Sequence, residues 1–143
     1  MNISKMTLDD LENIKFNLVS DFDDFWSYEV LKDEISSSSS LYFALKNKDE
    51  LIGFCGIKII TDFAEIMNIV IKKNYRGKHC SDELFKYILD YCKTTLNLKS
   101  INLEVNAKNT TAINLYKKYN FVQVGCRKKY YNNNDAILMT LKF

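Results

Sequence analysis

A basic loop at residues 71–85, IKKNYRGKHCSDELF, carries the residue types that bind phosphate. Its single glycine, Gly77, is surrounded by four basic side chains, Lys72, Lys73, Arg76 and Lys78. An apolar helical pattern begins directly after the loop, so unpaired backbone N–H groups and a helix dipole would add to the positive charge. The pattern predicts a phosphate-binding loop, although a solvated basic turn explains the loop alone equally well. It is neither a Walker loop nor a dinucleotide fingerprint, because the Gly-Lys-Ser/Thr triplet and three spaced glycines are missing.

A second group of candidate residues lies in INLEVNAKNTTAINLYKKYNF, residues 101–121. Strand alternation divides the first part of this segment into a polar face, Asn102, Glu104 and Asn106, and an apolar face, Ile101, Leu103 and Val105. On the following helix Asn109 and Tyr116 share a face, because seven residues make nearly two full turns. Taken singly, Glu104 is best explained as a solvated strand residue and Tyr116 as a core or rim residue. Together, a carboxylate, an amide and a phenol on neighbouring elements indicate a reaction site.

These segments resemble the GNAT superfamily of acetyl-CoA-dependent N-acetyltransferases. The resemblance rests on the Arg76-Gly77-Lys78 loop and on LEVNAKNTTAINLYKKYNF at residues 103–121. Within the superfamily, FWSYEVLKDEI at 25–35, the stretch from residue 103 to residue 131 and DAILM at 135–139 resemble the RimI-type ribosomal-protein alanine N-acetyltransferases. The similarity covers nearly the whole chain, and residues 104–121 are its most specific part.

The resemblance implies a role for each candidate residue. Glu104 matches the proton acceptor and Tyr116 the proton donor, while Asn109 matches a cofactor contact. The pantetheine arm of acetyl-CoA would lie along the backbone of Ile69, Val70 and Ile71. The pyrophosphate would bind at the loop residues Arg76, Gly77, Lys78, His79, Cys80, Ser81 and Asp82. Glu65 is a second candidate for the base, ranked below Glu104, because many members of the superfamily carry their carboxylate on the preceding strand.

The loop departs from the family pattern, which is Arg or Gln, two residues, Gly, one residue, then Gly or Ala. His79 and Ser81 occupy the two small-residue positions. If the backbone at His79 needs a positive φ, a non-glycine residue there costs roughly 1–2 kcal/mol, or about tenfold in affinity. Acidic Asp82 would also repel phosphate modestly. We therefore expect a weakened cofactor loop, and we expect no catalytic role for His79, the only histidine of the chain.

Hydrophobic periodicity predicts the elements that would position these residues. Helices are expected at 7–18, 23–35, 81–96 and 109–119, and strands at 41–47, 51–60, 64–73, 100–107, 121–131 and 136–143. A short strand before the first helix is a further option. The strand at 64–73 is apolar on both faces and is therefore expected at the centre of the sheet. The order predicts one α/β (α+β) domain over residues 1–143, a sandwich with a mixed central sheet flanked by helices. The resemblance adds that two central parallel strands splay apart.

Composition excludes several classes of function. The net charge of +2 is too small to imply nucleic acid or an acidic membrane as partner. The sequence has neither an apolar run of about 18 residues nor a signal-peptide pattern at its start. The four cysteines, Cys55, Cys80, Cys92 and Cys126, lack the paired spacing of metal ligands. We expect free thiols in a cytoplasmic protein, with no metal and no disulfide.

The expected function is transfer of acetyl from acetyl-CoA to a primary amine, most plausibly a protein N-terminus such as that of a ribosomal protein. A protein α-amine is mostly protonated near neutral pH, so a base is required. One alternative is a GNAT enzyme that acetylates a small-molecule amine. Another is a non-catalytic domain that binds CoA or a protein, against which Glu104, Asn109 and Tyr116 argue. A monomer or a weak dimer is expected.

Overall fold

One mixed sheet runs through the part of the chain that the computed structural model describes, residues 1–22, 26–131 and 133–143. Its order is β1-β2-β3-β4-β5-β7-β6, and every neighbouring pair is antiparallel except β4 and β5. The strands are β1 Asn2–Lys5, β2 Ser40–Asn47, β3 Glu50–Ile60, β4 Phe63–Ile71, β5 Ser100–Asn106, β6 Val122–Tyr131 and β7 Asn134–Lys142. The predicted α/β sandwich is confirmed, β4 is central as expected, and the short strand before the first helix is present.

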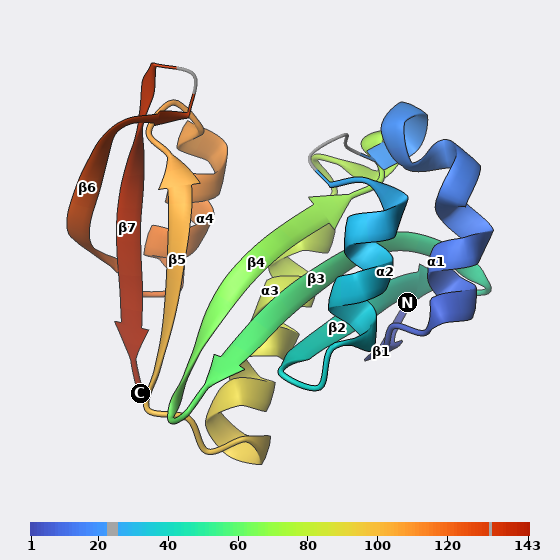
Figure 1. Cartoon of the computed structure of the whole chain (residues 1–143), viewed down its shortest axis with the longest axis horizontal. Helices are drawn as coiled ribbons and strands as arrows, with labels where there is room; N and C mark the ends of the chain where they lie inside the picture. Colours follow the sequence, from blue (N-terminus) through green and yellow to red (C-terminus); the bar gives the residue numbers. More distant parts are fainter. Residues whose placement is uncertain (23–25, 132) are drawn as a thin grey trace.

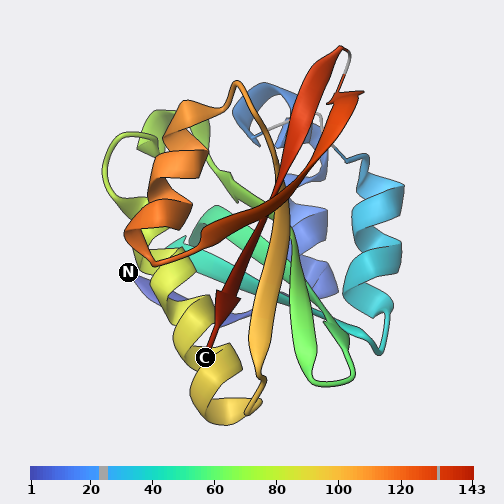
Figure 2. The same ribbon diagram turned by 90° about the vertical axis from the view of Figure 1, so that its left-hand side faces the viewer.

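Helices cover both faces of the sheet (Figures 1 and 2). One face carries α1 Leu8–Ile14 and α2 Tyr28–Ser36, and the other carries α3 Cys80–Asp90 and α4 Thr110–Lys118. Each face has its own hydrophobic core, in agreement with this three-layer arrangement. The apolar stripe predicted for the third helix is fully buried: Leu84, Phe85, Ile88, Leu89 and Cys92.

Several predicted helix boundaries need correction. The first helix is α-helical only to Ile14 and continues as a 3₁₀ and then a π turn to Phe22. The second begins at Tyr28, because Ser27 is extended and its Oγ accepts the Val30 N–H as an N-cap. Its predicted start at 23–25 lies outside the described residues, as does position 132 in the predicted Asn-rich turn. The third helix also ends in a π turn, over residues 91–95.

A capping box with a buried ion pair begins α1. The Thr7 Oγ1 accepts the Asp10 N–H at 3.1 Å, and the Asp10 carboxylate accepts the Thr7 N–H at 2.9 Å. Lys46 on β2 approaches the same carboxylate at 2.7 Å. Burial alone would raise the pKa of Asp10, but the hydrogen bonds from Lys46 and Thr7 outweigh it and hold that pKa below its ordinary value. This group therefore fixes α1 on the sheet.

The parallel strands β4 and β5 pair over only three residues and then separate (Figure 1). The paired residues are Phe63 with Ser100, Ala64 with Ile101 and Glu65 with Asn102. Further along, Met67 forms a β-bulge, since Gly56 pairs with Asn68 and Ile57 with Ile66. A bulge bends its strand and increases the local twist, so β4 turns away while β5 stays paired with β7 along its whole length. The predicted splay of the central parallel strands is confirmed.

The loop between β4 and α3 contains two residues in the left-handed region. Gly77 has φ 77°, and His79, the N-cap of α3, has φ 62° and ψ 16°. His79 thus meets the condition set from the sequence, a positive φ at a non-glycine residue. Because this conformation is part of the fold, its cost of roughly 1–2 kcal/mol falls first on the stability of the folded chain.

Substitution of Gly56 tests the packing beside the bulge. A Cβ added at Gly56 would lie 2.2 Å from Cζ of the buried Tyr42 ring. We expect Gly56→Ala to lower the free energy of unfolding, measured by urea denaturation, by about 1–3 kcal/mol, although alanine restricts the unfolded chain. Gly125→Ala is the control, because its Cβ would meet the flexible Cδ1 of Leu138 at 3.1 Å and should cost less. A Gly56→Ala protein as stable as wild type would contradict this packing.

Substitution of His79 tests the backbone strain. His79→Gly should raise the free energy of unfolding by up to about 1 kcal/mol, since relief of roughly 1–2 kcal/mol exceeds the entropic cost of about 0.5–1 kcal/mol. His79→Ala removes the imidazole but keeps the Cβ, so it should show no such gain. The measurement is urea denaturation of both variants and of the wild type under the same conditions. Equal stabilisation by both variants would show that the imidazole, rather than the backbone, is responsible.

Candidate active site

A cavity of about 520 Å³, here called the donor cavity, opens between the end of β4, the start of α3 and α4. Its lining includes most residues assigned to the cofactor: Ile69, Val70, Ile71, Arg76, Gly77, Cys80, Ser81, Asp82 and Asn109. Tyr116 lines the same cavity. The fold therefore brings the basic loop and the Asn109–Tyr116 face together, although they are far apart in sequence.

Of the basic residues expected at the cofactor, Arg76 lines the donor cavity, whereas Lys78 and His79 lie outside its lining. The Arg76 guanidinium donates to the backbone carbonyls of Ile71 and Phe22, at 2.9 Å and 2.8 Å, and so fastens the loop to the turn before α2. Lys78 lies over the ring of Tyr75, 5.4 Å from its centroid, and is not part of the cavity lining. His79 is also outside the lining, with a side chain that is 88% exposed.

The α4 residues are held by local packing. The Asn109 Oδ1 accepts the Ala112 N–H at 3.2 Å and caps the helix, which also fixes the amide at the cavity edge. The Tyr116 ring is buried against Phe85 and Phe121, with ring centroids 5.3 Å and 6.0 Å away. This packing leaves the ring little freedom to move, as a positioned proton donor requires.

Cys80 is the one thiol that lines the donor cavity among the described residues. Burial is the main reason that the pKa of this thiol lies above its ordinary value. The thiol therefore stays protonated at neutral pH and is a poor nucleophile toward a thioester. Direct attack by an acceptor amine fits the site better than a cysteine-bound intermediate.

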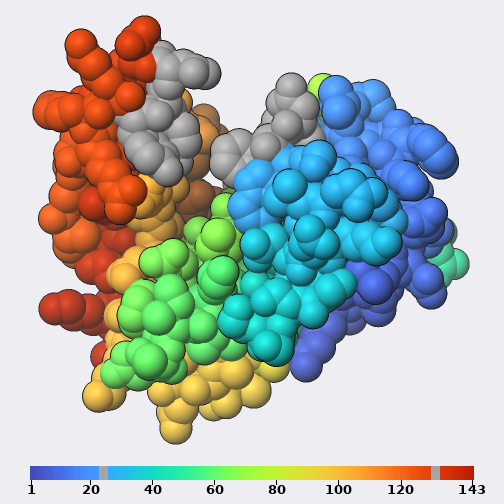
Figure 3. Space-filling view, in the orientation of Figure 1, coloured from blue at the N-terminus to red at the C-terminus, as the bar shows by residue number. Residues whose placement is uncertain are grey.

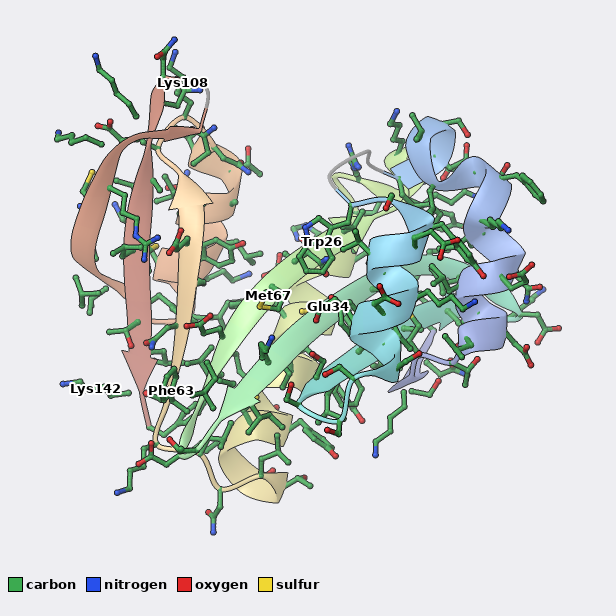
Figure 4. The ribbon with its side chains drawn as sticks, viewed as in Figure 1. Trp26, Glu34, Phe63, Met67, Lys108 and Lys142 are labelled. Atoms are coloured by element: carbon green, nitrogen blue, oxygen red, sulfur yellow. The ribbon has the colours of Figure 1, made fainter. Side chains whose placement is uncertain are left out.

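A second cavity of about 620 Å³, here called the acceptor cavity, lies on the α2 side of the gap. Figure 3 shows the molecule hollowed between the β4 side and the β5–β7 side, and Figure 4 shows Trp26 and Met67 beside β4 at this gap. The lining includes Trp26, Glu65, Met67, Glu104 and Arg127. Met67 and Ile69 of the same strand line one cavity each, so the two cavities adjoin along β4.

Both candidate bases line the acceptor cavity, in different surroundings. Glu104 lies on the polar face of β5, as the alternation predicted, with Oε1 3.3 Å from the Arg127 Nη2. Glu65 is exposed on β4, in register with Lys58 on one side and Asn102 on the other. The ion pair with Arg127 orients the Glu104 carboxylate, whereas the Glu65 carboxylate has no hydrogen bond or ion pair within the described residues.

Sequence reasoning missed Arg127, Trp26 and Met67. Strand alternation would assign a face to Arg127, but the register of β6 shifts between Gln123 and Gly125 and again beyond Arg127. Trp26 lies just before a helix whose start was placed too early. No signal in the sequence pointed to the bulge at Met67.

The described residues contain no group of three or more His, Cys, Asp or Glu side chains that could hold a metal ion. Among those same residues, none of the helices has the length and apolar content to cross a membrane. The candidate site is a pair of adjoining cavities, with Tyr116 in the donor cavity and Glu104 and Glu65 in the acceptor cavity.

Comparison with known proteins shows similarity to acetyltransferases over most of the chain. Residues 7–121 match the model of the acetyltransferase (GNAT) family. A protein of Bacillus subtilis, provisionally named a ribosomal protein bS18-alanine N-acetyltransferase, is 34% identical over 140 residues, which are 96% of this chain and 92% of the relative. The ribosomal protein bS18-alanine N-acetyltransferase of Escherichia coli is 28% identical over 71% of this chain and 70% of its own length.

Solved structures agree in fold and in arrangement. The crystal structure of the ribosomal-protein-S18-alanine N-acetyltransferase from Escherichia coli superposes with a TM-score of 0.90 at 25% identity, covering 99% of this chain and 92% of that one. The spermidine/spermine N-acetyltransferase from Vibrio cholerae superposes with a TM-score of 0.82 at 26% identity, covering 99% and 91%. By its sequence and its splayed sheet with two adjoining cavities, the chain belongs to the GNAT family of acetyltransferases.

Proposed function

We propose that this enzyme transfers acetyl from acetyl-CoA to the N-terminal α-amine of a cytoplasmic protein, with the N-terminal alanine of a ribosomal protein as the favoured acceptor. The observation that carries the proposal is the placement of Glu104 and Tyr116 in adjoining cavities on the two sides of one gap. Relatives named for this acceptor support the choice. Residues 1–143 would act as one catalytic domain.

The donor cavity suits acetyl-CoA, which supplies the acetyl group as a thioester. Between Ile66 and Ile71, a stretch described in full, β4 has no register partner on β5. Its backbone N–H and C=O groups at Ile69–Ile71 can therefore bind the amides of the pantetheine arm. Gly77 has open space where a Cβ would stand, which lets phosphate oxygens approach the loop backbone. The first turn of α3 would supply further N–H donors, and Asn109 a polar contact at the far wall.

The proton transfers divide between the two cavities. Glu104 takes a proton from the acceptor ammonium, because an α-amine is mostly protonated at neutral pH and must lose a proton to become a nucleophile. A backbone N–H near Ile69 stabilises the negative oxygen that develops on attack. The Tyr116 hydroxyl gives a proton to the departing thiolate. Arg127 keeps the Glu104 carboxylate oriented.

A small-molecule amine is the second candidate acceptor. The acceptor cavity of about 620 Å³ lies within the ordinary size range for small-ligand sites, and a spermidine/spermine N-acetyltransferase shares the fold. A non-catalytic CoA-binding domain is a poorer account, because the family is one of acetyltransferases.

Incubation of the purified protein with acetyl-CoA and a panel of amines tests the acceptor. The panel holds peptides beginning with Ala, Ser, Gly and Met, an N-terminally blocked Ala peptide that contains lysine, and spermidine. We expect release of free thiol and a mass increase of one acetyl group only with a free N-terminus, and most rapidly with Ala. Acetylation of spermidine alone would replace the protein acceptor with a polyamine.

Substitution of the two carboxylates tests the base. Glu104→Gln should lower kcat by about 10²-fold or more, because the amide cannot accept the proton. Acetyl-CoA binding, measured by calorimetric titration, should stay within about twofold of wild type, since Glu104 lies outside the donor cavity. Glu65→Gln is the matched control, because it changes the same group in the same cavity and should have a small effect on kcat. The reverse result would assign the base to Glu65.

A further inference from the structure

A polar cluster centred on Asp82 lies where the loop enters α3. The Asp82 carboxylate forms an ion pair with Lys118, and the Tyr119 hydroxyl lies 3.3 Å from one of its oxygens. The His79 Nδ1 lies 3.7 Å from the other oxygen. The hydrogen bond with Lys118 is the main reason that the pKa of Asp82 is lowered and that of Lys118 raised. Both partners are therefore charged at neutral pH.

This ion pair joins two helices at the wall of the donor cavity. Asp82 belongs to the first turn of α3 and Lys118 is the last residue of α4, and both line the cavity. The neighbouring Tyr119 ring packs on Phe85 with ring centroids 5.3 Å apart, which fixes the end of α4 against α3. The Lys118 ammonium is thereby held beside the first turn of α3, in the lining of the cavity.

Most basic side chains of the loop are committed elsewhere. Lys72 pairs with Glu50 at 2.8 Å, Lys73 donates to the Val19 carbonyl at 3.5 Å, and Arg76 donates to two backbone carbonyls. Of the described residues that line the donor cavity, only Arg76 and Lys118 carry a positive charge. An ammonium group has three N–H donors, so the bond to Asp82 leaves Lys118 with donors to spare.

A phosphate bound at the start of α3 would need a cation between itself and the Asp82 carboxylate. A phosphate at the α3 N-terminus would lie near the Asp82 carboxylate, and two unscreened anions repel. His79 in place of the family glycine also keeps a side chain beside the loop backbone. A cation between the carboxylate and the phosphate would remove the repulsion and add an attractive contact.

We infer that Lys118 is a phosphate-binding residue of the donor site, bridging the Asp82 carboxylate and a phosphate of acetyl-CoA. The packing of Tyr119 on Phe85 keeps Lys118 at the cavity, and its ammonium offsets the repulsion between the Asp82 carboxylate and the phosphate. The inference rests on acetyl-CoA as donor in the proposed function, but it is independent of the acceptor. The diphosphate and the 3′-phosphate of the nucleotide offer the same chemistry to Lys118.

Calorimetric titration with acetyl-CoA, without any acceptor, tests the inference. Lys118→Gln should weaken binding about fivefold or more and flatten the dependence of Kd on salt, whereas Lys118→Arg should stay within about twofold of wild type. Lys117→Gln removes a neighbouring exposed charge outside the cavity lining and should also stay within twofold. Repeating the titrations with 3′-dephospho-acetyl-CoA identifies the phosphate: a penalty that persists indicates the diphosphate, and one that disappears indicates the 3′-phosphate.

Asp82→Asn separates phosphate binding from a purely structural link between α3 and α4. If Lys118 binds phosphate, loss of the carboxylate leaves the ammonium in place and removes a repulsion, so affinity should be equal to wild type or tighter. If the pair only holds the helices together, Asp82→Asn should weaken binding as much as Lys118→Gln, which would overturn the inference. Wild-type affinity in Lys118→Gln would overturn it as well. If no peptide of the acetylation panel is acetylated, the protein acceptor is refuted and these titrations remain valid. If the wild-type chain does not bind acetyl-CoA, the donor site and the inference are both overturned.

Discussion

The whole site depends on a hydrogen-bonding constraint at the centre of the sheet, where β4 and β5 share only three register pairs. Each strand is fully paired on its other side, β4 with β3 and β5 with β7, so neither can follow the other once the bulge at Met67 bends β4. Unpaired backbone groups in a protein interior are costly unless something binds them. The edge of β4 is thus suited to receive the amides of an extended ligand, and both cavities form along it.

A splayed sheet needs a second fastening, and α3 and α4 supply one on their face of the sheet. Phe85 of α3 packs against Tyr116, Tyr119 and Phe121, and the Asp82–Lys118 ion pair lies at the rim of this aromatic group. Together they join the half built on β1–β4 to the half built on β5–β7.

The basic loop has the positive φ angles expected of a phosphate-binding loop, but several of its basic side chains bind other parts of the protein. His79 adopts a left-handed conformation without being glycine, and the Arg76 guanidinium anchors the loop through the Ile71 and Phe22 carbonyls. In the inferred donor site, recognition of phosphate would depend on backbone N–H groups and on a cation from another helix. The number of basic residues in the loop sequence is therefore larger than the number of positive charges that the loop offers to a ligand.

Local periodicity was enough to place the central features of the site from the sequence. The alternation on β5 set Glu104 on the polar face, and helical spacing set Asn109 and Tyr116 on one face, because both patterns depend only on the geometry of a single element. The family pattern around residues 104–121 then connected these faces with acetyl transfer. The predicted helix limits near residues 15–22 and 91–95 needed correction, because π and 3₁₀ turns interrupt the periodicity there.

Tertiary structure alone decided which partners these side chains meet. Arg76 binds the Phe22 carbonyl, Glu104 pairs with Arg127 and Asp82 pairs with Lys118. The two residues of each pair are far apart in the sequence, so the periodicity of a single helix or strand cannot predict the contact. The bulge at Met67 and the division of the site into two cavities follow from the registers of β3, β4 and β5. Such registers depend on packing of both faces of the sheet at once, so the sequence determined the candidate residues and the fold determined how they are paired.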